Sequence, residues 1–163
     1  PSRSHRIPPD RQPHGETMRL LTHNTLRNNA GDAGQGGFPL KITATEVRVD
    51  DPSFATSAAA SGPAAAFGGE GREVAFVRGV LPVLDWPALV QGANDLGLKT
   101  LPPTFTEEAA ADPAFLRALY HVLMNVHLVR GMLTCPATGR EFPVTDGIAD
   151  FMLEEDECDN VRY

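Results

Sequence analysis

Residues 112–153, DPAFLRALYHVLMNVHLVRGMLTCPATGREFPVTDGIADFML, decide the fold because their pattern changes from helical to strand-like along the way. Asp112 is a candidate N-cap, and Pro113 suits the first helical position because its missing N–H would have no partner there. The predicted helix has one apolar stripe at helical spacing. The stripe consists of Phe115, Leu116, Leu119, Leu123 and Val126.

Short strand-like segments follow this helix. Residues 126–129 and 132–134 flank Arg130-Gly131, which we interpret as a tight hairpin turn. Residues 141–144 and 148–153 flank Thr145-Asp146-Gly147, and Asp-Gly is a strong hairpin signal. The sequence therefore predicts a small antiparallel sheet in this part of the chain.

The earlier part of the chain supplies another strand and another helix. A short helix with one apolar face is expected around Leu20, a glycine-rich loop at residues 28–37, and a strand at residues 38–49. A helix over residues 85–96 is indicated by Asp85 as N-cap and by Gly97 after its end. The simplest architecture is a discontinuous α+β domain of residues 18–50 and 126–153, interrupted by a helical insertion of residues 51–125.

Three segments have little to bury. Residues 1–17 are polar and proline-rich and are interpreted as a disordered tail or a remnant of upstream sequence, so that Met18 begins the folded part. Residues 51–71 are a small-residue, low-complexity stretch, interpreted as a flexible insertion. Residues 154–163 form an acidic tail.

Charge and composition exclude several classes of function. The formal net charge is −7, and a protein that binds nucleic acid broadly needs a surplus of Lys and Arg. Two cysteines are too few for a disulfide-stapled secreted fold, so we expect an intracellular, reduced protein. No apolar run reaches the roughly 20 residues of a membrane span.

We find no residue pattern that predicts catalysis or a metal site. No serine lies in a nucleophile-elbow pattern, and the carboxylate runs at 107–108 and 154–157 are typical of solvated surfaces. Cys135-Pro136-Ala137-Thr138-Gly139 resembles the Cys-Pro-x-Cys-Gly turn of zinc ribbons, but Thr138 replaces the second thiolate. The predicted turn is therefore metal-free, with a small buried thiol.

The ordered motifs of residues 18–153 together resemble the eukaryotic multifunctional methyltransferase activator subunit. The resemblance rests on MRLLTHN at residues 18–24, GFPL at 37–40, TEV at 45–47 and Asp85-Trp86, followed by GMLTCP at 131–136, GREFPV at 139–144 and DGIADFML at 146–153. In zinc-bearing members the upstream cysteine pair would fall near Asn28 and Ala33, so this chain lacks it.

This resemblance implies a zinc-ribbon-like sheet domain with an inserted helical domain, and no catalytic residues. It implies a heterodimer with class I methyltransferase catalytic subunits that modify tRNA, rRNA and a translation release factor, in the cytoplasm and nucleus. The partner would bind S-adenosylmethionine, and this chain would hold no cofactor. This chain would associate with RNA only indirectly, through the partner. The alternative is a ribbon-like RNA-binding module of a ribosome-maturation particle.

The contact surface is expected on the sheet domain. For Leu20 and Ile148, burial in the domain's own core is an equally good interpretation, whereas Phe151 and Met152 are adjacent in a strand and must face opposite sides. His23 and Asn24 are polar residues in a leucine-rich motif, so we expect them to form hydrogen bonds at a helix end or interface. The full predicted set is Leu20, Thr22, His23, Asn24, Phe38, Pro39, Ile148, Phe151, Met152 and Leu153.

Overall fold

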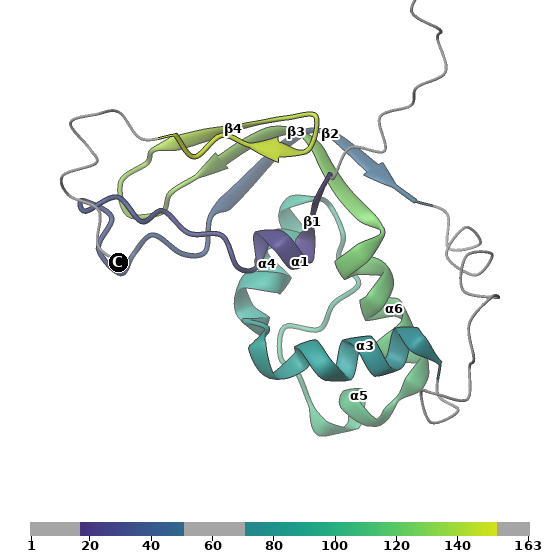
Figure 1. Ribbon diagram of the computed structural model, residues 1–163. Coiled ribbons are helices and arrows are strands. Elements are labelled where there is room, and N and C mark those ends of the chain that lie inside the picture. Colours follow the sequence, from purple (N-terminus) through teal and green to yellow (C-terminus); the bar gives the residue numbers. More distant parts are fainter. Residues whose placement is uncertain (1–16, 51–70, 153–163) are drawn as a thin grey trace, which may run out of the picture.

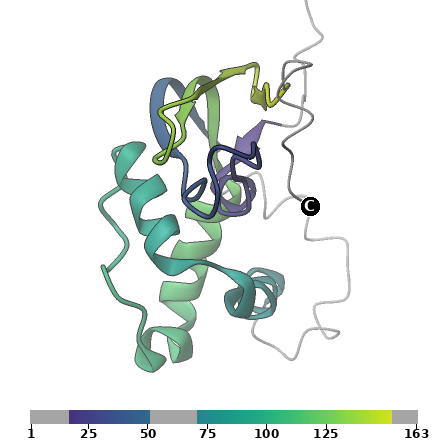
Figure 2. The ribbon, with the colours of Figure 1, turned by 90° about the vertical axis from the view of Figure 1, so that its left-hand side faces the viewer.

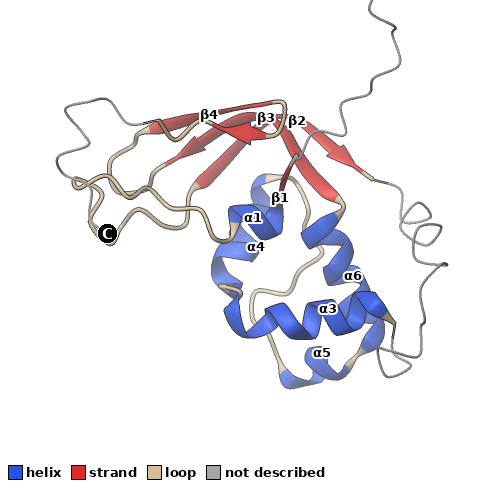
Figure 3. Cartoon of the chain, in the orientation of Figure 1, coloured by secondary structure: helices blue, strands red, loops and turns tan. Residues whose placement is uncertain are grey.

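The computed structural model describes residues 17–50 and 71–152. A curled antiparallel sheet lies on one side of the molecule and the helices lie on the other (Figures 1 and 2). The strands come from residues before 50 and after 125, and the helices come from residues 72–124 apart from one short helix at residues 20–23 (Figure 3). This arrangement confirms the predicted α+β class.

Among the residues that the structure describes, the sheet has five strands, built around the central strand β3 (Val126–Thr134). β2 (Lys41–Val49) pairs with β3 over its whole length. The other edge of β3 pairs first with β1 (Met18–Arg19) and then with β4 (Glu141–Thr145). β5 (Ile148–Ala149) pairs with β4 and forms the outer edge.

The predicted hairpin turn at Arg130-Gly131 is wrong, because β3 runs through these residues without a break. Gly131 pairs with Ala44 on one side and with Val144 on the other. A Cβ at Gly131 would lie 2.4 Å from the carbonyl oxygen of Thr43, so glycine is needed here for the close approach of two strands. A break in register in β2, between Ala44 and Val47, lies beside this position.

The predicted turn at Asp146-Gly147 is confirmed. Both residues have positive φ, 52° and 78°, as a two-residue hairpin turn of the primed type requires. β5 is shorter than predicted, because the chain leaves the sheet soon after Ala149. The Asp150 carboxylate accepts a hydrogen bond from the Met152 N–H (3.0 Å), which turns the chain locally.

The predicted helix starts are confirmed for two helices. Asp85 caps α4 (Trp86–Asp95) by accepting a hydrogen bond from the Ala88 N–H (2.9 Å), and Asp112 caps α6 (Pro113–Met124) in the same way. The short helix α1 (Leu20–His23) also forms as expected. Three further elements were not predicted from the sequence: α3 (Arg72–Val80), the 3-10 turn η2 (Leu81–Val83) and α5 (Glu107–Ala111).

One hydrophobic core runs from the sheet into the helices. Leu40, Leu133 and Phe142 contribute from the sheet side, and Leu89 and Leu119 contribute from the helices. The division into an interrupted sheet domain and an inserted helical domain stays a prediction. Of the predicted low-complexity stretch at 51–71 and the predicted tails at 1–17 and 154–163, all but residues 17 and 71 lie outside the described residues.

Thr17, which the sequence analysis assigned to the tail, is part of the fold. Its hydroxyl donates a hydrogen bond to Nδ1 of buried His127, whose Nε2 donates to the Asp50 carboxylate (2.8 Å). The Arg48 guanidinium bonds both Thr17 (3.3 Å) and Asp50 (3.2 Å). This network ties the start of β1 to the ends of β2 and β3.

Candidate binding surface

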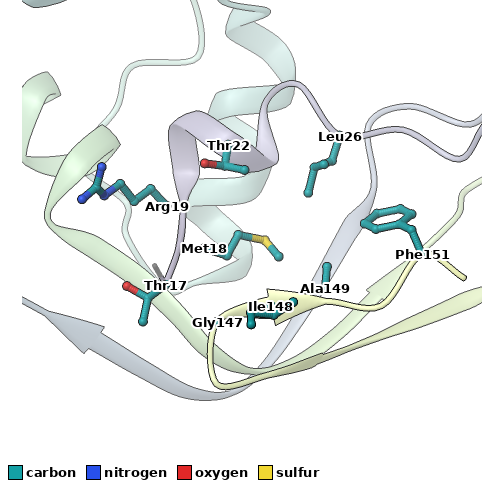
Figure 4. Close-up of a pocket in the computed structure, with 9 residues that line it drawn as sticks. All are labelled: Thr17, Met18, Arg19, Thr22, Leu26, Gly147, Ile148, Ala149 and Phe151. Atoms are coloured by element: carbon teal, nitrogen blue, oxygen red, sulfur yellow. The ribbon is translucent and has the colours of Figure 1, made fainter. Parts of the chain in front are cut away.

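Two large apolar side chains, one on β5 and one just after it, are exposed on the same part of the surface. Ile148 is 68 % exposed and Met152 is 81 % exposed. Beside them a groove of about 510 Å³ separates β5 from β1 and α1 (Figure 4). The groove is lined by Thr17, Met18, Arg19, Thr22, Leu26, Gly147, Ile148, Ala149 and Phe151.

The edge of β5 that faces this groove offers backbone groups for pairing. The Asp150 N–H donates to the Pro143 carbonyl of β4 (2.9 Å), so the peptide groups of Asp150 point toward β4. Because these directions alternate along an antiparallel strand, the peptide groups of Ala149 point the other way. No strand of residues 17–50 or 71–152 pairs with that edge.

Phe151 and Met152 lie on opposite faces of the chain. The Phe151 ring stacks on the buried Phe142 ring, with centroids 4.4 Å apart and an angle of 24° between the planes. The Arg140 guanidinium covers Phe142 at 5.4 Å and also bonds the Met152 carbonyl (3.2 Å). Phe151 therefore anchors the segment, while Met152 extends outward.

The opening segment contributes less surface than the sequence analysis expected. Leu20, His23 and Asn24 are buried in the chain's own core, which for Leu20 is the alternative that the sequence left open; a role of the three in partner contact stays a prediction. These side chains are buried because α1 packs against the sheet, α4 and α6, which the local sequence does not reveal. Only Thr22 of this helix is exposed, and it lines the groove.

His23 is a structural histidine. Its Nε2 donates to the Leu40 carbonyl (2.7 Å), and its Nδ1 is buried without a hydrogen-bond partner among the described residues. The ring packs on Gly92 of α4, where a Cβ would lie 3.0 Å from Nδ1. Burial lowers the pKa of His23 below its ordinary value, although the bond to Leu40 and the nearby Asp95 charge oppose this shift.

The remaining predicted residues lie apart from the groove or outside the described chain. Phe38 and Pro39 are half-buried after the glycine-rich loop, with the Arg27 guanidinium 5.5 Å from the Phe38 ring centre. Neither lines the groove beside β5. Leu153 is outside the described residues, and nothing tests its role.

Sequence reasoning missed part of the groove. Met18 points into it from β1, and Leu26 approaches Phe151 at one end (Figure 4). Arg19 directs its guanidinium away from β5. Met18 and Leu26 were the available signals, because both are apolar residues within or next to the motif at residues 18–24.

Within residues 17–50 and 71–152, no three His, Cys, Asp or Glu side chains are close enough to hold a metal ion. No helix of this part is long and apolar enough to cross a bilayer. Cys135 is a free, buried thiol.

The fold and this surface define a small α+β protein with an exposed apolar sheet edge beside a shallow groove, the arrangement of a protein-binding subunit. No family model matches the chain. It is 37 % identical over 142 residues to the multifunctional methyltransferase subunit TRM112-like protein of Mus musculus, covering 87 % of this chain and 99 % of that protein. It is 37 % identical to multifunctional methyltransferase subunit TRM112 homolog A of Arabidopsis thaliana, covering 86 % and 99 %.

The similarity extends to fungi. The Saccharomyces cerevisiae multifunctional methyltransferase subunit TRM112 is 27 % identical over 146 residues, with 83 % of this chain and 96 % of that protein covered. The chain belongs to the multifunctional methyltransferase subunit TRM112 family. The predicted resemblance is thereby confirmed.

Proposed function

We propose that this chain is a non-catalytic activator subunit that binds methyltransferase catalytic subunits through the groove and the free edge of β5. The observation that carries this proposal is the exposure of Ile148 and Met152 beside an unpaired strand edge. The names of the relatives support it, since each is a methyltransferase subunit. The mouse and Arabidopsis relatives are covered almost entirely, so the likeness is not confined to one part of those proteins.

The binding mode follows from the geometry of the edge. A partner strand can pair with the outward peptide groups of Ala149, while its side chains enter the groove beside Met18 and Leu26. Such pairing would cover Ile148 and Met152 together with apolar surface of the partner. Each protein then loses an exposed apolar edge that is a hazard for the free protein.

Activation in this account is a stability effect. A subunit that binds the folded catalytic subunit and not its unfolded chain raises the stability of that subunit by mass action. We propose a heterodimer with class I methyltransferases acting on tRNA, rRNA and a release factor, in the cytoplasm and nucleus. S-adenosylmethionine and RNA are bound by the partner in this proposal, and this chain supplies neither a cofactor site nor a catalytic group.

We also propose that the sheet is a ribbon-type domain that has kept the turn at Cys135 without a metal. The turn is closed by hydrogen bonds from the Cys135 N–H to the Arg140 carbonyl (2.8 Å) and from the Gly139 N–H to the Cys135 carbonyl (2.9 Å). Gly139 has φ of 73°, which a glycine adopts readily.

Co-expression tests the proposed function. A methyltransferase catalytic subunit from the same organism is produced with and without this chain, and its melting temperature and methyl transfer are measured. The expected result is a 1:1 complex with a higher melting temperature and more activity than the catalytic subunit alone. A catalytic subunit that is equally stable and active alone would contradict the proposal, and salt-dependent RNA binding by the isolated chain would favour the RNA-binding alternative.

A further inference from the structure

The sheet has a second free edge, along β2 and at the opposite end of the strand order from β5. β2 pairs with β3 on one side, and its other side is unpaired among the residues that the structure describes. Asp95 of α4 covers the start of this edge, because its carboxylate accepts a hydrogen bond from the outward Ile42 N–H (2.9 Å). Residues 45–49 are exposed without exception, and the arrowhead of β2 lies at the margin of the molecule (Figure 1).

The peptide groups of Val47 and Val49 point outward from this edge. The Asp50 N–H donates to the Asn125 carbonyl (2.8 Å), so the peptide groups of Asp50 point toward the β3 side. Because the register is regular from Val47 to Val49, the directions alternate: Arg48 points toward β3, and the two valines point away. The valine side chains are also accessible, with Val47 38 % and Val49 54 % exposed. The end of β2 therefore offers both backbone groups and apolar surface.

Two opposite charges flank Val47 on the other face of β2. Glu46 and Arg48 alternate with Val47 along the strand, so their side chains share one face. Glu46 lies 3.6 Å from the Arg130 guanidinium, and Arg48 lies 3.2 Å from the Asp50 carboxylate. The side chains of Glu46 and Arg48 are 57 % and 47 % exposed, and ion pairs at such positions contribute little. Both charges stay accessible to a partner.

We propose that this edge pairs with the same edge of a second copy of the chain, antiparallel about a two-fold axis at Val47. The two Val47 residues would then exchange N–H···O bonds, and Glu46 of each copy would lie opposite Arg48 of the other. The sequence around Val47 is thus complementary to itself in charge. An axis at Arg48 would instead set two guanidinium groups opposite each other, so the charges select the register.

The contact is short, because the break in register between Ala44 and Val47 interrupts the edge on one side. We therefore expect a weak dimer that forms at high protein concentration. The β5 edge remains free in this dimer, so each copy can still hold its own catalytic subunit. The inference goes beyond the proposed function and does not depend on it, since it uses the other edge of the sheet.

Sedimentation equilibrium of the full chain, up to millimolar concentration, tests the pairing. A reversible monomer–dimer equilibrium is expected. Arg48→Glu sets two carboxylates opposite each other at both symmetry-related positions, so it should raise the dimer Kd at least about tenfold. Adding Glu46→Arg reverses both charges and should restore dimerisation. Lys41→Glu is the matched control, because it makes the same change of charge on an exposed residue at the start of β2, away from the axis, and should leave the Kd unchanged.

Circular dichroism checks that each variant is folded, because Arg48 also bonds Asp50 and Thr17. If Arg48→Glu does not fold, Val47→Asp decides: it changes an exposed side chain and sets two carboxylates at the axis, so it should also raise the Kd at least about tenfold. A chain that is monomeric at every concentration would overturn the proposal, as would a dimer that Val47→Asp weakens no more than Lys41→Glu. Loss of binding to a methyltransferase catalytic subunit on Val47→Asp would also overturn it, since the edge would then belong to that partner.

Discussion

The side chain of Asn24 forms two hydrogen bonds with the backbone of Asp85, a residue 61 positions further along the chain. Its Nδ2 donates to the Asp85 carbonyl (2.9 Å), and its Oδ1 accepts from the Asp85 N–H (2.9 Å). Asp85 in turn caps α4. One buried amide therefore fixes the end of α1, beside the groove, to the start of α4.

Asn24→Ala should remove both hydrogen bonds and leave the Asp85 backbone groups poorly satisfied. We expect a loss of about 2 kcal/mol in the free energy of unfolding, measured by urea denaturation. Asn24→Asp should not recover this loss, because its buried carboxylate would place an oxygen against the Asp85 carbonyl oxygen. A change below about 0.5 kcal/mol for Asn24→Ala would show that the two hydrogen bonds between Asn24 and Asp85 contribute little to the stability of the fold.

Two glycines should respond to alanine in opposite directions. Gly131→Ala places a Cβ 2.4 Å from the Thr43 carbonyl oxygen in the middle of the sheet, so it should destabilise the chain by about 1–3 kcal/mol. Gly79→Ala, in α3, meets no atom within 4 Å and should stabilise the helix by about 0.5–1 kcal/mol. Equal changes in the free energy of unfolding for the two variants would mean that the close approach of β2 and β3 at Gly131 does not require a glycine.

Local signals predicted much of the fold. Asp85 and Asp112 begin helices, and Asp146-Gly147 turns a hairpin, because each of these depends only on neighbouring residues. Arg130-Gly131 was misread because its partners, in β2 and β4, are not visible in the local sequence. α3 was missed because it is short and buries only Val74 and Val77.

The candidate site was predicted in part for the same reason. The sequence placed Phe151 and Met152 on opposite sides of the chain; in the structure Phe151 packs on Phe142 and Met152 is exposed, although both lie beyond the end of β5. The burial of His23 and Asn24 could not be predicted from the local sequence, because it depends on contacts with Leu40 and Asp85 that are made only in the folded chain. Polar residues in an apolar motif indicated hydrogen bonds correctly but not their location inside the core.

Stability should fall as the pH drops below about 6.5, in part because of His23. The folded-state pKa lies below the ordinary value of 6.5, so the unfolded chain binds the proton first and protonation favours unfolding. His23→Gln keeps a donor for the Leu40 carbonyl and does not titrate. Its melting temperature should therefore fall less than that of the unmodified chain between pH of about 7.5 and 5.5; an equal fall in both would assign the acid sensitivity to other groups.

Phe151 and Met152, which follow β5, should differ in how much their replacement by alanine changes the free energy of unfolding. Phe151→Ala removes a ring stacked on Phe142 and should lower the free energy of unfolding by about 1–3 kcal/mol. Met152→Ala, at an exposed position, should change it by less than about 0.5 kcal/mol. Thermal denaturation of both variants checks this, and a larger effect for Met152 would reverse the assignment of anchor and contact.

The most direct test of the binding surface is the affinity of the Ile148→Asp, Met152→Lys double variant for a methyltransferase catalytic subunit, measured by calorimetry with circular dichroism of the free variant. Both side chains face water in the free chain, so the variant should stay folded, whereas charges buried at an interface without partners should weaken binding at least about a hundredfold. The control is Val83→Asp, at a position 76 % exposed in η2, which should bind normally. Unchanged binding by the folded double variant, or an equal loss for Val83→Asp, would contradict the account.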